Sequence, residues 1–80
     1  MQTNEIDVRV REILRLALKT DVPEEGSYAR EDDPNWDSLK HVEMIFMLED
    51  EFDVQFAEDD FAKMGSVAAI VALVEANHAA

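Results

Sequence analysis

The feature that most constrains the fold is the spacing of apolar residues between positions 38 and 52. On a helical wheel at about 100° per residue, they separate into two stripes on opposite sides of one helix. The first stripe contains Met44, Ile45, Leu48 and Phe52, with His41 at its edge. The second contains Leu39, Val42 and Phe46, ringed by Glu43, Glu49 and Asp50. The first stripe predicts a core-facing side, whereas the second indicates either a helix buried on both sides or an exposed docking face.

Three further segments have helical spacing, and no segment has a convincing strand pattern. Residues 3–19 form an amphipathic helix whose core face contains Ile6, Val10, Ile13, Leu14 and Ala17, widened by Val8, Leu16 and Leu18. Residues 57–64 predict a short helix with Phe61 facing inward, and Ser66 can cap a last helix that runs to about residue 77. This order predicts an all-α fold over a single domain of residues 1–80. It is a small four-helix bundle of three main helices plus a short third helix.

A long connection over residues 20–36 separates the first two helices. Pro23, Gly26 and Pro34 oppose a continued helix there. Seventeen residues is long for a connection in a small domain, which favours a functional loop. Val22, Tyr28 and Trp36 are its candidate anchors to the core.

Negative charge is concentrated in the middle of the chain. The net charge is −12, and residues 31–60 contain twelve acidic side chains against one basic side chain, Lys40. This field disfavours nucleic acid and anionic membranes as partners and favours basic protein surfaces. No apolar run is long enough for membrane insertion, and no signal peptide is recognisable. There is no cysteine and therefore no disulfide. We expect a cytoplasmic monomer.

Ser38 stands where the second helix begins. The first backbone N–H groups of a helix lack intrahelical partners, and the helix dipole favours an anion there, so this serine is a good point of attachment for a phosphate. The alternative is that Ser38 or Asp37 is only an N-cap.

Two other chemistries fit the same region poorly. Residues 33–37 match the opening of an EF-hand calcium loop, but Ser38 replaces the glycine of the turn and Met44 replaces the bidentate glutamate. We therefore expect no metal site. Ser38 and His41 lie three residues apart, yet no nucleophile elbow surrounds them, so His41 is predicted to be a packed histidine and no catalytic residue is assigned.

The run D-S-L-K-H-V-E-M at residues 37–44, continued by L-E-D-E-F at residues 48–52, resembles the acyl carrier protein family. The resemblance is strong over residues 37–75, whereas residues 3–19 match only as an amphipathic helix. It implies a non-enzymatic carrier with 4′-phosphopantetheine attached to Ser38 through a phosphodiester. A phosphopantetheinyl transferase would supply the group from coenzyme A, and the terminal thiol would hold acyl groups as thioesters.

The resemblance also implies a partner surface on the second helix. Acyl-loading and acyl-processing enzymes with basic docking surfaces would bind through Asp37, Leu39, Val42, Glu43, Phe46, Glu49 and Asp50. The pathway would be fatty-acid, polyketide or specialised acyl biosynthesis. Trp36 before the motif resembles specialised carriers, some of which carry amino acids. An aminoacyl or peptidyl carrier with the same prosthetic group, and an acidic helical adaptor without one, are therefore the alternatives.

Overall fold

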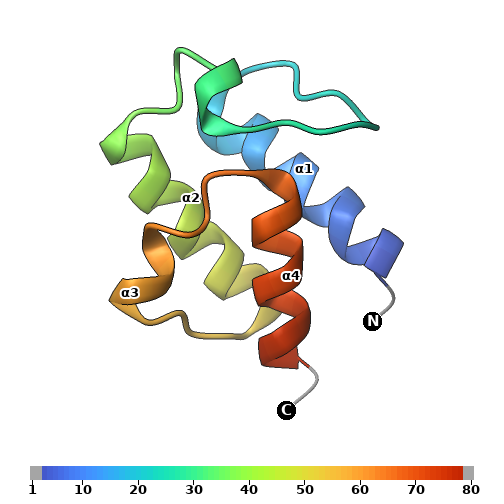
Figure 1. Ribbon diagram of the computed structural model, residues 1–80, viewed down its shortest axis with the longest axis vertical. Helices are drawn as coiled ribbons and strands as arrows, with labels where there is room; N and C mark the ends of the chain where they lie inside the picture. The colour runs from blue at the N-terminus through green and yellow to red at the C-terminus, as the bar shows by residue number, and fades with distance from the viewer. Residues whose placement is uncertain (1–2, 79–80) are drawn as a thin grey trace.

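The computed structural model describes residues 3–78, and the named secondary-structure elements of these residues are all helices. Within these residues the chain forms α1 (Thr3–Leu18), the 3₁₀ turn η1 (Arg30–Asp32), α2 (Ser38–Phe52), α3 (Glu58–Phe61) and α4 (Val67–His78). The long connection between α1 and α2 crosses one end of the helices, and the short α3 lies beside α2 (Figure 1). The predicted all-α four-helix bundle is confirmed.

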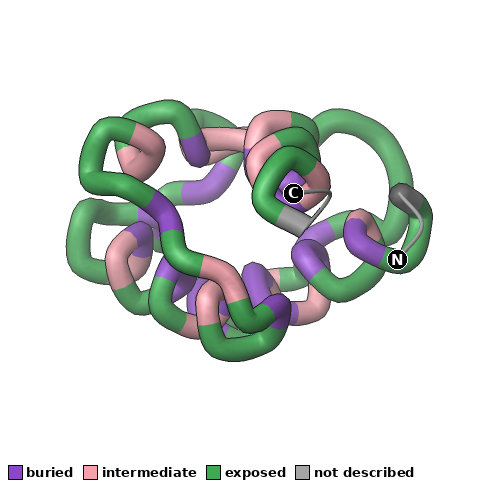
Figure 2. The backbone as a smooth tube through the Cα atoms, turned by 90° about the horizontal axis from the view of Figure 1, so that it is seen from below, coloured by how far each residue is buried: buried purple, intermediate pink, exposed green. Residues whose placement is uncertain are grey.

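The core lies where α1 packs against both α2 and α4. Buried stretches recur along each of these helices between exposed ones, as an amphipathic pattern requires (Figure 2). The first stripe of α2 is entirely buried, as predicted, and so is its His41 edge. The fully buried side chains from the three helices include Val10, Leu14, Met44, Ile45, Leu48, Ile70 and Val74.

The core face of α1 is narrower than predicted. Val8 and Leu16 are 53% and 68% exposed, so they do not widen the stripe, whereas Leu18 is buried. Arg11, which lies off the apolar face, is only 6% exposed. Its burial has a clear cause, because the long connection folds over this side of the helix.

Arg11 fastens that connection to α1. Its guanidinium pairs with Asp7 at 2.7 Å and donates hydrogen bonds of 2.7 Å to the carbonyls of Pro23 and Gly26. Arg15 adds a hydrogen bond of 2.9 Å to the carbonyl of Val22. The three bonds to Val22, Pro23 and Gly26 each give a loop carbonyl a hydrogen-bond donor in place of water.

The predicted anchors of the connection are confirmed. Val22 and Trp36 are buried, and Tyr28 packs against the core while remaining partly exposed. The connection is also joined to the segment before α4 by an isolated bridge between Ala29 and Ser66.

The third helix is shorter than the predicted 57–64 and spans only Glu58–Phe61. Beyond it, Lys63 N–H donates to the Asp60 carbonyl and Met64 N–H donates to the Phe61 carbonyl, which are i to i+3 bonds of tight turns. Met64 is nonetheless fully buried. No helix within residues 3–78 is long and apolar enough to cross a membrane.

Candidate functional site

The start of α2 frees the hydroxyl of Ser38. Asp37, and not Ser38, is the N-cap: its carboxylate accepts a hydrogen bond of 2.8 Å from the Lys40 N–H. Ser38 is the first helical residue and is exposed to solvent. An aspartate cap therefore satisfies the helix end and leaves the adjacent serine oxygen available for chemistry.

Arg30, a residue that the sequence reasoning missed, reaches this serine from η1. Its Nη2 lies 3.3 Å from Ser38 Oγ, and its Nε donates a 2.9 Å hydrogen bond to the Trp36 carbonyl. Its backbone N–H donates to the Gly65 carbonyl at 2.8 Å. The available signal was weak: Arg30 is the last basic residue before the acidic run, but it is eight positions from Ser38 and shares no periodicity with it.

Three elements meet through hydrogen bonds to His41, which lies three residues after Ser38 in α2. The Trp36 indole N–H donates to Nδ1 of His41 at 2.9 Å, and Nε2 of His41 lies 2.7 Å from the Phe61 carbonyl. The two rings are tilted by 32° with centroids 6.1 Å apart. Both ring nitrogens of His41 are thus occupied by structural partners, as the prediction of a packed histidine implies.

Asp33 organises the turn that leads into the site. This buried carboxylate accepts hydrogen bonds from the Tyr28 hydroxyl at 2.8 Å and from the Asn35 N–H at 2.9 Å. Partial burial, and then the bond to Asp33 with the negative charges of Asp33 and Asp32, raise the pKa of Tyr28 to about 12. Asp33, which opens the EF-hand-like run, therefore has a structural role in the loop.

The second stripe of α2 lies on the outside. Leu39 and Phe46 are 67% and 58% exposed, and Val42 is half-buried. Glu43 and Asp50 are exposed beside them, and Glu43 pairs with Lys40 at 3.7 Å. The helix is therefore not buried on both sides, and it presents apolar side chains among carboxylates.

Glu49 differs from the other carboxylates proposed for that face. It is half-buried, and its Oε2 accepts a 2.9 Å hydrogen bond from the Phe56 N–H. It therefore holds the chain that leaves α2, next to the left-handed C-cap residue Asp53. A basic group of a partner would therefore bind a carboxylate that already accepts one hydrogen bond from the backbone.

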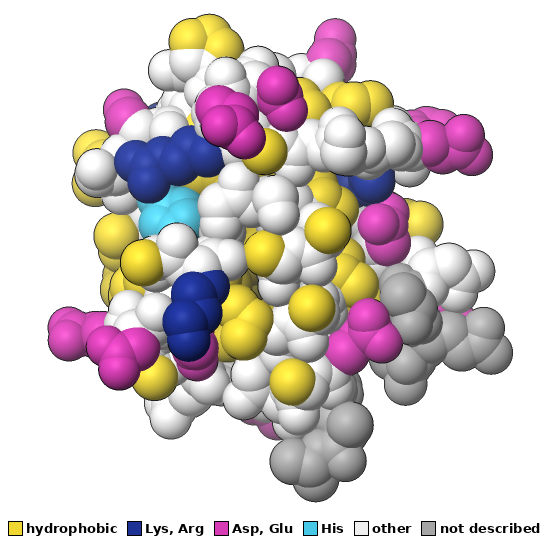
Figure 3. Space-filling model, viewed as in Figure 1, with side chains coloured by type: hydrophobic (Ala, Val, Ile, Leu, Met, Phe, Trp, Pro, Cys, Tyr) yellow, Lys and Arg dark blue, Asp and Glu magenta, His cyan; other side chains and the backbone are white. Residues whose placement is uncertain are grey.

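Charge is unevenly spread over the rest of the surface. On the face shown in Figure 3, acidic side chains lie around the margin and hydrophobic ones are exposed nearer the centre.

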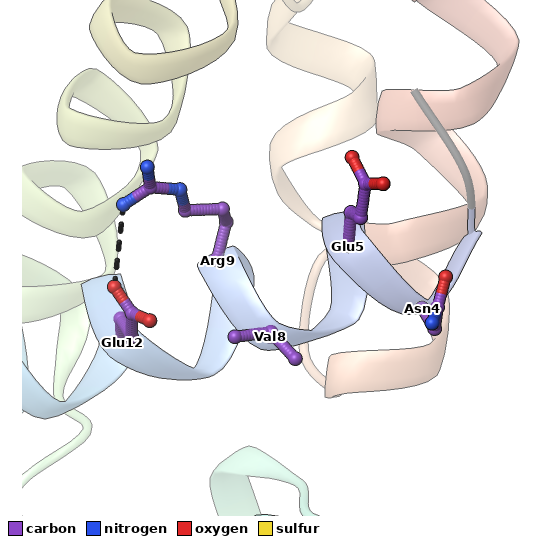
Figure 4. A pocket seen from close by; sticks show the side chains of 5 residues that line it. All are labelled: Asn4, Glu5, Val8, Arg9 and Glu12. Atoms are coloured by element: carbon purple, nitrogen blue, oxygen red, sulfur yellow. Dashed lines mark hydrogen bonds and ion pairs between the residues drawn. The ribbon is translucent and has the colours of Figure 1, made fainter.

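A separate hollow of about 480 Å³ lies on α1, lined by Asn4, Glu5, Val8, Arg9 and Glu12 (Figure 4). All five side chains come from α1, and two of them, Arg9 and Glu12, form an ion pair of 3.4 Å. The hollow therefore shares no residue with the Ser38 site.

Comparison with known proteins identifies what this arrangement is similar to. The family model described as "Phosphopantetheine attachment site" matches residues 36–74. An acyl carrier protein of Exiguobacterium sp. is 37% identical over 78 residues, covering 94% of this chain and 96% of the relative. Acyl carrier proteins of Akkermansia muciniphila and Clostridium acetobutylicum are 32% and 35% identical, covering 94% and 86% of this chain and 95% and 91% of the relatives.

Proposed function

The chain belongs to the acyl carrier protein family, and from that premise we propose that Ser38 is the residue that bears its prosthetic group. Proteins of this family are carriers and not enzymes, and their prosthetic group is covalently attached 4′-phosphopantetheine. When attached, the group supplies a terminal thiol that holds cargo as a thioester. The observation that carries the assignment is the exposed Ser38 hydroxyl beside its own aspartate cap.

Ser38 fits the group better than the other two serines of the chain. Ser66 also stands at a helix start, directly before α4, but its Oγ accepts a 3.1 Å hydrogen bond from the Ala69 N–H and so acts as the cap of that helix. Ser27 is exposed in the connection and does not stand at the start of an α-helix. At Ser38 the backbone N–H groups of a 15-residue helix and the Arg30 guanidinium both favour an attached phosphate.

The class of cargo is inferred from the relatives. The three relatives are acyl carrier proteins, which favours acyl groups over the aminoacyl alternative. The absence of cysteine means that the arm would carry the only thiol of residues 1–80, so no internal thiol would exchange with the thioester. We assign the protein to fatty-acid, polyketide or specialised acyl biosynthesis.

The partner surface is the exposed stripe of α2. A phosphopantetheinyl transferase and acyl-processing enzymes with basic surfaces would be steered by Asp37, Glu43 and Asp50. The apolar contact would come from Leu39, Val42 and Phe46 at its centre. Glu49 belongs to the same surface, with its carboxylate held by Phe56.

Intact-protein mass spectrometry tests the proposal. Incubation with coenzyme A and a promiscuous phosphopantetheinyl transferase should add one phosphopantetheinyl group to the wild-type protein. Ser38→Ala should abolish the addition, whereas Ser27→Ala and Ser66→Ala should be modified like the wild type. A labelled Ser38→Ala variant, or an unlabelled wild type, would contradict the assignment.

A further inference from the structure

We infer that Arg30 binds the phosphodiester of the prosthetic group once it is attached to Ser38. This inference rests on the proposed function and adds a residue that no motif of the family run contains. Its basis is the 3.3 Å contact between Nη2 of Arg30 and Ser38 Oγ, the atom that would become the ester oxygen. Phosphate oxygens bonded to the same phosphorus would lie within reach of the same guanidinium.

The backbone and the side chain of Arg30 are both held before any phosphate arrives. The backbone N–H is bonded to the Gly65 carbonyl, and Nε is bonded to the Trp36 carbonyl, itself adjacent to the buried Trp36 ring. These contacts direct the far end of the guanidinium at Ser38. Little side-chain freedom would therefore be lost when a phosphate binds, which favours the contact.

The charge of Arg30 is also available. Among the described residues Arg30 forms no ion pair with a carboxylate, whereas Lys40, the other basic residue near Ser38, is paired with Glu43. Residues 31–60 carry a strong excess of acidic side chains, so a phosphodiester at Ser38 adds negative charge to an already negative region. A planar guanidinium that can donate two parallel hydrogen bonds is well suited to offset it.

Modified proteins provide the test. Wild type, Arg30→Gln, Arg30→Lys and Lys40→Gln are each converted to the phosphopantetheinyl form with excess transferase, and the ³¹P resonance of the phosphodiester is recorded. Lys40→Gln is the matched control, because it removes one positive charge two residues from Ser38 without removing the proposed contact. Circular dichroism and Trp36 fluorescence check that each variant is folded.

The inference predicts a distinct pattern. Arg30→Gln should shift the ³¹P resonance and lengthen its transverse relaxation time, Arg30→Lys should give an intermediate value, and Lys40→Gln should match the wild type. In about 1 M sodium chloride, where the screening length is about 3 Å, the difference between wild type and Arg30→Gln should shrink. Attachment of the group should also raise the thermal midpoint of the wild type by about 2–4 °C more than that of Arg30→Gln.

The result that overturns the inference is equally specific. If the ³¹P shift and relaxation of Arg30→Gln coincide with those of the wild type, Arg30 serves only to hold Trp36 and Gly65. The same conclusion follows if Lys40→Gln changes both quantities as much as Arg30→Gln does. Failure of the wild type to accept the group is a different outcome, because it overturns the proposed function before Arg30 is tested.

Discussion

The indole N–H of Trp36 donates a 2.9 Å hydrogen bond to Nδ1 of His41, which fixes the histidine in one tautomer. With Nδ1 as an acceptor, the proton is on Nε2, which donates to the Phe61 carbonyl at 2.7 Å. The imidazole therefore joins the loop, α2 and α3, three residues along α2 from Ser38. His41 activates no nucleophile in this arrangement, and its role is to position the residues around the serine.

Removal of this imidazole should destabilise the fold strongly. His41→Ala leaves the buried indole N–H and the Phe61 carbonyl without their partners, and each such loss costs about 1–3 kcal/mol. Urea unfolding should show the decrease in the free energy of unfolding. Trp36→Phe and the double variant complete a mutant cycle, in which a coupling energy of about 0.5–3 kcal/mol is expected. A coupling energy of zero would mean that the hydrogen bond contributes nothing.

Alkaline pH should weaken the fold through Tyr28. Its pKa is about 12 in the folded protein, above the ordinary 10.0, so between these values the folded state binds more protons than the unfolded state. The free energy of unfolding must then fall as pH rises through this window, and the contribution of Tyr28 is fully present below pH 10. Because the chain has one tyrosine, absorbance of tyrosinate reports this group directly. Tyr28→Phe should show a smaller loss of stability over the same window, and equal losses would exclude Tyr28 as the cause.

Truncation on the exposed side of α2 should weaken partner binding, whereas truncation on the buried side should lower the free energy of unfolding. Phe46→Ala should weaken binding of an acyl-processing partner by more than about 1 kcal/mol, as for a hot-spot side chain. Because Phe46 is 58% exposed, the same change should alter the free energy of unfolding by no more than about 0.5 kcal/mol. Calorimetric titration and urea unfolding measure the two effects.

Leu48→Ala is the control for that comparison. Leu48 is fully buried, and the cavity should cost about 2–5 kcal/mol of stability. Equal destabilisation by Phe46→Ala and Leu48→Ala would mean that the outer stripe is part of the core. An unchanged partner affinity for Phe46→Ala would remove it from the proposed docking surface.

Arg11 should contribute more to the stability of the fold than Arg9, which lies two residues earlier on α1. Arg11→Gln breaks the ion pair with Asp7, whose side chain is 32% exposed, and the hydrogen bonds to two loop carbonyls, so we expect a loss of about 1–3 kcal/mol. Arg9→Gln removes the same charge from an exposed pair with Glu12 and should cost no more than about 0.5 kcal/mol. Thermal unfolding of the two variants compares them directly, and similar midpoints would contradict a clamping role for Arg11.

Local sequence predicted the parts of this molecule that depend on local periodicity. The bounds of α2, Ser38–Phe52, and the separation of its buried and exposed stripes follow from spacing at 3.6 residues per turn. The contacts that Arg11 and Arg30 make with the long connection and with Ser38 could not be found in that way. Apart from Asp7, which lies one helical turn from Arg11, the side-chain partners lie 12 and 15 positions from Arg11 and 6 and 8 positions from Arg30. Periodicity likewise assigned Val8 and Leu16 to the core, although both are exposed in the structure.

The bridge between the long connection and the segment before α4 has a consequence for amide hydrogen exchange. The Arg30 amide donates to the Gly65 carbonyl, and the Val67 amide donates to the Tyr28 carbonyl at 2.9 Å. These paired bonds join parts of the chain that are far apart in sequence, so neither amide can exchange through fraying of a single helix. Both should exchange in one cooperative opening that also breaks the contact between Arg30 and Ser38. The stretch around the serine would then open and close as one unit with the start of α4.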